Sequence, residues 1–329
     1  MADWNPGVGA YRAAMRLAGI LPRTGAMCLA DLAAELAMRR SRSRRVVVER
    51  NLLRIWGARP PDRVIRSAVR RTFRSYARYW YESLLLPSLP LEEVDRRFGF
   101  EGLEHILRAR EEGRGPLMVI PHLGGWEWAA RWLTGVAGIP LTAVVEPLEP
   151  RELFEFFVEY RRRLGVHVVP LGPSAAAEIV RAVRRREVVC LLADRDIAGN
   201  GVPVEFFGEV TTLPAGPATL ALRTGAPLLP TAVYFRGEGL YTVVRPPLRV
   251  ERRGRLRDDV LRVTKMVAAA LEDLIRRAPE QWHVMSPNWP SDRALVERLG
   301  GVDRVGVTRA ADTGFSGGSG EDAEAVQAP

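Results

Sequence analysis

Hydrophobic residues recur every three or four positions through the first part of the chain, which is the spacing of amphipathic α-helices. This pattern predicts helices over residues 11–39, interrupted at Pro22, and over residues 44–56. A further helix after Pro60-Pro61 has one basic and one apolar face. Its arginines are Arg63, Arg66, Arg70, Arg74 and Arg78, and its apolar residues are Ile65, Val69, Phe73, Tyr76 and Trp80. The basic face suits either anionic lipid headgroups or solvent, and the pattern favours neither.

From residue 101 the pattern changes to short apolar runs that alternate with amphipathic helices. The expected strands are residues 117–120, 141–145, 166–169, 188–193, 202–206, 228–235 and 241–244. The expected helices are residues 103–112, 126–136, 152–164, 174–186, 215–223 and 257–277. This alternation predicts an α/β fold with a mostly parallel central sheet flanked by helices, preceded by an amino-terminal helical region. We expect one domain over residues 1–302, divided into a helical part (1–90) and an α/β core (91–302), and a disordered tail over 303–329.

Composition narrows the class of protein. The net charge of +9 calls for an anionic partner or surface. The arginines are spread over helix faces without a nucleic-acid-binding module, so we expect no nucleic acid. Cys28 and Cys190 have no metal-ligand or disulfide spacing, and the four histidines do not cluster, so we expect no metal site. The chain shows neither a membrane-spanning run nor a signal peptide, which predicts a cytosolic or peripheral membrane protein.

The segment 117–128 carries the strongest chemical signal. An apolar run ends at Pro121-His122, passes through Gly124-Gly125 and enters a predicted helix that holds Glu127. Ligands of parallel sheets bind where strands end and helices begin. A neutral histidine that takes a proton from a hydroxyl needs its other nitrogen held by an acceptor, often a carboxylate. His122 and Glu127 form a candidate pair of this kind, although a histidine followed by an acid at this spacing also arises by chance.

Five ordered blocks extend this signal. They are the His-x4-acid motif at 122–127, an arginine block at 156–165, Asp194-Arg195-Asp196, residues 204–209 continuing into 213–218, and a proline element at 225–230. Together they resemble the lysophospholipid acyltransferase superfamily, in the branch of bacterial lipid A acyltransferases and phosphatidylinositol mannoside acyltransferases. Supporting similarity runs over residues 63–86 and at Gln281-Trp282-His283. The residues of the blocks, with this Trp-His near the end, look closest to the mannoside enzymes. Three departures stand out. Glu127 replaces the aspartate of many members, residues 184–187 read Arg-Arg-Arg-Glu where the family usually has a glycine turn, and the long anchor segment of the lipid A branch is missing.

The resemblance implies roles for particular residues. His122 would be the general base on an acceptor hydroxyl, Glu127 would fix the imidazole, and backbone N–H groups near Gly124, Gly125 and Trp126 would support the oxyanion. Arg161, Arg163 and Arg195 would bind phosphate or form ion pairs. Asp194, Asp196 and Glu205 would accept hydrogen bonds from sugar hydroxyls or orient those arginines. Phe206 and Phe207 would line an acyl tunnel or simply pack. The remaining substrate-binding or loop candidates are Glu146, Gly208, Glu209, Pro214 and Gly216.

The implied activity is transfer of a palmitoyl-like chain to a mannose hydroxyl of a mannosylated phosphoinositide. Acyl-CoA would be the co-substrate, without a permanently bound cofactor, although acyl carrier protein remains an open alternative as donor. The enzyme would work peripherally at the cytoplasmic face of the cell membrane, on an anionic surface that its helical part contacts. A lipid A precursor or glycerol phosphate is the alternative acceptor, and a non-catalytic lipid-binding protein is a further alternative.

Overall fold

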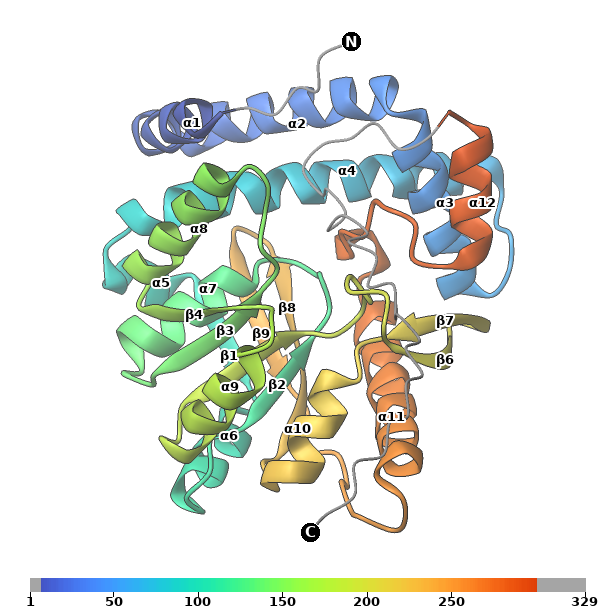
Figure 1. The fold of residues 1–329 in the computed structure, drawn as a ribbon. Coiled ribbons are helices and arrows are strands. Elements are labelled where there is room, and N and C mark those ends of the chain that lie inside the picture. The colour runs from blue at the N-terminus through green and yellow to red at the C-terminus, as the bar shows by residue number, and fades with distance from the viewer. Residues whose placement is uncertain (1–6, 301–329) are drawn as a thin grey trace, which may run out of the picture.

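A seven-stranded sheet forms the centre of the computed structural model, which describes residues 7–300 (Figure 1). The strand order is β1-β9-β8-β2-β5-β3-β4, and every neighbouring pair is parallel except β8–β9. The strands are β1 (Phe98–Glu101), β2 (Leu117–Ile120), β3 (Leu141–Val145), β4 (Val166–Pro170), β5 (Val188–Leu192), β8 (Leu228–Arg236) and β9 (Gly239–Val244). The predicted mostly parallel α/β sheet is therefore confirmed.

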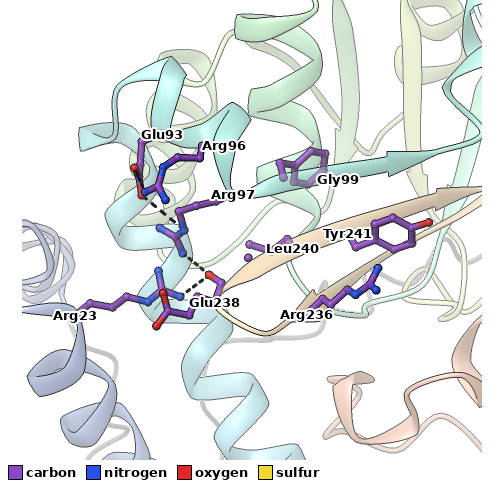
Figure 2. Close-up of a pocket in the computed structure, with 11 residues that line it drawn as sticks. Arg23, Glu93, Arg96, Arg97, Gly99, Arg236, Glu238, Leu240 and Tyr241 are labelled. Carbon is purple, nitrogen blue, oxygen red and sulfur yellow. Dashed lines mark hydrogen bonds and ion pairs between the residues drawn. The ribbon is translucent and has the colours of Figure 1, made fainter.

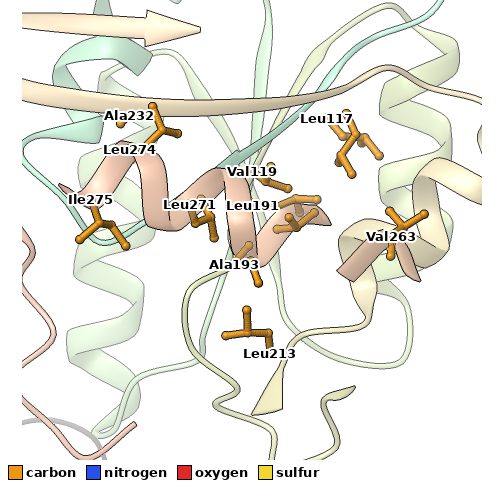
Figure 3. Packing of buried hydrophobic residues seen from close by; sticks show 14 of the residues in the cluster. Leu117, Val119, Leu191, Ala193, Leu213, Ala232, Val263, Leu271, Leu274 and Ile275 are labelled. Atoms are coloured by element: carbon orange, nitrogen blue, oxygen red, sulfur yellow. The ribbon is translucent and has the colours of Figure 1, made fainter. Parts of the chain in front are cut away.

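Helices cover both faces of the sheet. Successive side chains of a strand point to opposite faces, so one strand contributes to two buried clusters. In β2, Leu117 and Val119 join one buried cluster, whereas Met118 and Ile120 join the other. Figure 3 shows the first cluster, in which strand residues meet Leu271 and Leu274 of α11. The flanking helices of that side are α9 (Ala175–Arg184), α10 (Gly216–Thr224) and α11 (Leu256–Arg276). The other side carries α5 (Leu91–Arg96), α6 (Leu103–Glu111), α7 (Trp126–Arg131), a π-helical turn η2 (Trp132–Val136) and α8 (Arg151–Arg163).

The amino-terminal region is helical, as predicted. Its helices are α1 (Val8–Ile20), α2 (Arg23–Arg40), α3 (Arg42–Trp56) and α4 (Asp62–Leu85), followed by the 3-10 turn η1 (Leu86–Ser88). The apolar face of α4 is buried at Ile65, Val69 and Phe73. Within residues 7–300, no helix combines the length and the apolar character that crossing a membrane requires.

The arginine face of α4 is mostly exposed, as expected, and part of it also forms ion pairs and hydrogen bonds within the fold. Arg70 Nε lies 2.8 Å from the Glu35 carboxylate of α2, and Arg74 approaches the same carboxylate at 3.4 Å. Arg78 donates to the carbonyl of Gly237 at 2.9 Å. Arg70 and Arg74 pair with α2 because it packs along α4, but their side chains stay 54% and 44% exposed. Arg78 instead bonds with the β8–β9 turn. Lipid or solvent remains available to Arg63 and Arg66, which are exposed.

Several elements differ from the predicted ones. β6 (Val202–Phe206) lies outside the main sheet, because it pairs with β7 (Glu209–Leu213) in an antiparallel hairpin. The edge strand β1, the hairpin strand β7 and two helical elements after α11 were not predicted. The last two are η3 (Pro279–Gln281) and α12 (Pro290–Arg298). The predicted disordered tail, 303–329, lies outside the described residues.

Candidate active site

His122 lies two residues after the end of β2, at the carboxyl edge of the sheet. Asp194 follows β5, the strand beside β2, and the Ala193 N–H donates to the carbonyl of Ile120 at 3.0 Å. Because these parallel strands end at the same level, they bring the two residues together. The His122 Nδ1 atom lies 2.6 Å from Asp194 Oδ1, and the His122 backbone N–H donates to Asp194 Oδ2 at 2.9 Å. The carboxylate therefore holds both the ring and the backbone of His122.

Asp194 is fully buried and anchored by a distant segment of the chain. The Trp282 indole N–H donates to Asp194 Oδ2 at 2.7 Å, and the Asn288 side-chain amide donates to the Asp194 carbonyl at 2.9 Å. Burial alone would raise the pKa of Asp194. The charge of His122 and the hydrogen bonds from His122 and Trp282 outweigh burial, so the pKa lies below its ordinary value. The carboxylate is ionised at neutral pH and fixes Nδ1 as the protonated ring nitrogen.

Because Nδ1 faces Asp194, Nε2 is the ring nitrogen that can accept a proton. The His122 side chain is 27% exposed, whereas its carboxylate partner is enclosed. A partly open imidazole backed by a buried carboxylate is the arrangement of a general base.

Glu127 does not occupy the position that we predicted. It is the second residue of α7 and is 2% exposed. The Tyr79 hydroxyl donates to Glu127 Oε1 at 3.0 Å, and Arg161 Nη2 approaches the same oxygen at 3.5 Å. No hydrogen bond joins Glu127 to His122 among the described residues. The helical start of α7 directs Glu127 toward α4 and α8, whereas β5 delivers Asp194 to the imidazole, so Asp194 makes the predicted contact instead.

Glu127 nevertheless belongs to a buried network behind the site. Burial raises its pKa, although the charge of Arg161 and the hydrogen bond from Tyr79 act in the opposite direction. The Arg161 guanidinium lies 5.1 Å from the ring centre of Trp126 and 5.8 Å from that of Phe157. These contacts link α4, α7 and α8 around the turn that follows His122.

Glu146 and Arg195 lie at the same edge of the sheet. Glu146 follows β3, which is the neighbour of β5, and Arg195 follows Asp194. Burial raises the pKa of Glu146, opposed by the positive charges of Arg195 and His122. The ends of β2, β5 and β3 thus gather four of the predicted residues: His122, Glu146, Asp194 and Arg195.

The predicted glycine turn is required by packing. Gly124 has a φ of +62°, and a Cβ atom there would lie 1.8 Å from the Val233 carbonyl oxygen. The Gly124 N–H already donates to the Gln281 carbonyl at 3.0 Å, so it is not available to an oxyanion. This corrects one of the three predicted donors and leaves the N–H groups of Gly125 and Trp126 as candidates.

The turn of the β6–β7 hairpin packs against the segment that holds Asp194. Phe206 stacks on Trp289 at 5.9 Å and meets Trp282 edge-on at 6.1 Å, while Phe207 lies 5.9 Å from Trp282. Both phenylalanines are buried in the core, which agrees with the packing alternative for them. Glu209 bonds with Arg54 and Ser291 in the same region.

The other predicted residues lie away from His122 or make local contacts. Arg163 pairs with Glu159 on the exposed side of α8. Asp196 accepts the N–H groups of Gly199 and Gly201 at 2.9 and 2.8 Å, and so shapes its own turn. Glu205 is exposed on β6. A Cβ atom added at Gly208 or Gly216 would meet no described atom within 4 Å, and Pro214 is partly buried. Their predicted contacts with substrate stay predictions.

The comparison with known proteins decides the family. A family model described as bacterial lipid A biosynthesis acyltransferase matches residues 6–291. The chain belongs to this family. The resemblance predicted from the motif blocks is thereby confirmed, and this chain is an acyltransferase.

The relatives of this acyltransferase divide into two groups. A phosphatidylinositol mannoside acyltransferase of Mycolicibacterium smegmatis is 35% identical over 285 residues, covering 86% of this chain and 91% of the relative. One from Mycobacterium tuberculosis is 37% identical over 258 residues, covering 76% and 79%. A lipid A biosynthesis acyltransferase of Haemophilus influenzae is 26% identical over 197 residues, covering 58% of each chain. This acyltransferase is therefore more similar to the mannoside enzymes than to that lipid A enzyme.

Sequence reasoning missed Trp282 and Asn288 as site residues. The run Gln281-Trp282-His283 is a feature of the family resemblance, but it carries no sign of contact with Asp194. The His283 N–H donates to the His122 carbonyl at 2.7 Å, and its Nε2 lies 2.9 Å from the Ser75 hydroxyl. Burial, together with the charge of His122, lowers the pKa of His283 to about 3, so this second imidazole is neutral and structural.

Replacing Trp282 with phenylalanine tests whether the indole supports Asp194. Loss of the N–H leaves Asp194 Oδ2 with only the His122 backbone donor, so we expect a raised Asp194 pKa and roughly tenfold slower acyl transfer. The pH–rate profile and unfolding in urea are the measurements. Trp289→Phe is the matched control, because the Trp289 indole donates to the carbonyls of Phe206 and Glu209. Equal shifts of the pH profile in both variants would contradict the assignment.

Proposed function

We propose that this acyltransferase moves a palmitoyl-like acyl group from acyl-CoA to a mannose hydroxyl of a phosphatidylinositol mannoside. The observation that carries the proposal is the His122–Asp194 pair at 2.6 Å, at the edge where a parallel sheet binds ligands. The two most similar relatives described above, both named for phosphatidylinositol mannosides, support the acceptor.

The chemistry follows from the pair. His122 Nε2 takes the proton of the acceptor hydroxyl, whose oxygen attacks the thioester carbonyl carbon. The tetrahedral intermediate then collapses, the carbon–sulfur bond breaks, and the imidazolium returns its proton to the departing thiolate. Asp194 holds the imidazole in place and stabilises its positive charge while it carries the extra proton. The buried network of Glu127, Tyr79 and Arg161 fixes the start of α7, from which the N–H groups of Gly125 and Trp126 would face the oxyanion.

No covalent acyl-enzyme is needed in this scheme, because a thioester already has a good leaving group. Cys190 is consistent with direct transfer: burial, and secondarily the charge of Glu127, raises the pKa of its thiol to about 12. The thiol therefore stays protonated and is a poor nucleophile.

The membrane contact of this enzyme would be made by α1 and α2. Six large apolar side chains are exposed along these helices: Leu17, Ile20, Leu21, Leu29, Leu32 and Leu36. Water disfavours such a row, whereas the boundary between lipid headgroups and acyl chains accommodates it. Exposed arginines accompany it, including Arg12 and Arg16, and these would attract anionic lipid at the cytoplasmic face.

A double substitution Leu29→Gln and Leu32→Gln tests this surface. Both side chains lie on one face of α2 and are more than half exposed, so the fold should tolerate the change. We expect binding to phosphatidylglycerol-containing vesicles to weaken about tenfold or more, as apolar area is lost from the bilayer. Vesicle flotation is the measurement. The control Leu171→Gln and Val210→Gln changes exposed apolar residues elsewhere, and an equal loss there would contradict the proposed surface.

The acceptor is tested directly by radiolabelled palmitoyl-CoA with a panel of lipids. Label should appear on phosphatidylinositol mannosides and be absent in a His122→Ala control. Transfer only to a lipid A precursor or to glycerol phosphate would refute the mannoside acceptor, while leaving the acyltransferase assignment intact. Transfer from acyl carrier protein but not from coenzyme A would refute the proposed donor.

A further inference from the structure

A basic cavity lies beside the active site, at the edge of the sheet formed by β1 and β9 (Figure 2). Its volume is about 610 Å³, and its charged lining consists of Arg23, Arg96, Arg97, Arg236, Glu93 and Glu238. The catalytic scheme above uses none of these residues. Because β9 begins where β8 ends, the cavity opens at the same end of the sheet as His122. Leu240 separates the two: it lines the cavity, and a Cβ on Gly125 would lie 2.8 Å from its Cδ2 atom.

The cavity wall is built around a buried carboxylate. Glu82 of α4 is fully enclosed and binds Arg23 and Arg97, both at 2.8 Å. Arg23 and Arg97 also donate to the Glu238 carbonyl at 2.7 and 3.0 Å, while Arg78 donates to Gly237 and Gly239. The arginines are thereby fixed against the β8–β9 turn. Counting Arg78 and Glu82, five arginines stand against three glutamates, so positive charge is in excess.

Free donors remain on these guanidinium groups. Within residues 7–300, Arg23 and Arg97 make their side-chain hydrogen bonds through Nη2 alone, which leaves Nη1 of each group for a ligand. Arg236 lies over the Tyr241 ring at 5.4 Å, and no carboxylate of the described residues lies within ion-pair distance of it. A guanidinium group that is held in a fixed orientation can donate two parallel hydrogen bonds to the oxygens of a phosphate.

The position of the cavity indicates the source of the phosphate. Arg23 begins α2, two residues after the exposed Leu21, and the exposed Leu17 and Ile20 end α1. A lipid whose acyl chains meet this apolar corner would place its headgroup next to Arg23. We propose that the cavity binds the phosphate of an anionic phospholipid headgroup, separately from the acyl acceptor at His122. This proposal rests on the membrane contact in the proposed function, but not on the identity of the acceptor.

The test uses a soluble lipid, so that attraction of the basic protein to a charged vesicle surface does not contribute. Monomeric dihexanoyl-phosphatidylglycerol is titrated into the full-length protein by calorimetry, with dihexanoyl-phosphatidylcholine and inorganic phosphate as separate arms. We expect one saturable phosphatidylglycerol site, weakened about tenfold or more in the double variant Arg96→Gln and Arg236→Gln. Both side chains are exposed, so the buried ion pairs of Glu82 stay intact. The matched control is Arg181→Gln with Arg184→Gln, two exposed arginines of α9 on the opposite side of the sheet, which should keep the site.

Each contrary outcome has a distinct meaning. Equal weakening in the control pair would show diffuse electrostatics and overturn the proposal. Loss in Arg195→Gln but not in the cavity variant would place the lipid at the catalytic edge and overturn it too. Inorganic phosphate that binds as tightly as the lipid would make this a site for free phosphate instead. Because the readout is binding, a failed acceptor assay leaves the result interpretable.

Discussion

Replacing His122 with alanine is expected to lower kcat for acyl transfer by roughly 10²–10⁴-fold, which is the contribution of a positioned general base. The imidazole is only partly buried, so the fold should survive the loss of its ring. Without Nε2, the acceptor hydroxyl must lose its proton to water, while binding of both substrates persists. Steady-state kinetics with a labelled acyl donor would therefore show a fall in kcat and little change in KM.

His167→Ala is the control for this variant, because His167 is exposed on β4 and bonds with no residue of the site. A folded His122→Ala protein that retains full acyl transfer would eliminate His122 as the base. Near-ultraviolet circular dichroism establishes that the aromatic packing around Trp282 is unchanged in both variants.

Asp194→Asn is expected to reduce kcat by a similar factor, about 10²–10⁴-fold, although the imidazole is still present. The amide cannot stabilise the imidazolium by charge, and it presents an N–H group where His122 needs an acceptor. The ring then favours the tautomer with the proton on Nε2, which cannot act as a base. Asp95→Asn is the matched control, because Asp95 also accepts an indole N–H, from Trp132 at 2.8 Å, but lies on α5.

Acid unfolding gives a second readout for Asp194. Its pKa is lower in the folded protein than in the unfolded chain, so its ionised form stabilises the fold above the unfolded-state pKa of about 4. That stability is lost as the pH falls toward the folded-state pKa. The free energy of unfolding of the native protein should thus exceed that of Asp194→Asn most at neutral pH, and the gap should close below about pH 4. A gap that stays constant with pH would contradict the depressed pKa.

Much of the fold could be predicted because local sequence patterns determine most of its helices and strands. The apolar run of β2, the proline that ends it and the two glycines that follow mark the turn at His122 in the sequence itself. β1 and β7 were missed because each is short and contains or adjoins polar residues and glycine. Strand 202–206 was recognised as a strand, but nothing local shows whether a strand joins the main sheet or pairs with its own hairpin partner.

The error at Glu127 has a physical origin. Spacing along the chain made Glu127 the nearest carboxylate to His122, whereas the contact depends on which strand neighbours β2. Strand order is a property of the whole sheet, and Asp194 reaches His122 only because β5 is that neighbour. Asp194 is among the site residues predicted from the sequence. The family resemblance implies a different role for it, however, which is to bind sugar hydroxyls or to orient arginines.

The anchoring of Asp194 by Trp282 also bears on how the enzyme is made. These residues lie 88 positions apart, and every motif block up to residue 230 precedes Trp282 in the chain. A ribosome therefore completes the five motif blocks well before it supplies the indole and the Asn288 amide that secure the catalytic carboxylate. A gene truncated between these points would still carry all five blocks, yet its product would lack the hydrogen bonds that hold Asp194. Premature stop codons between residues 230 and 282 should consequently impair the enzyme although its five blocks are intact.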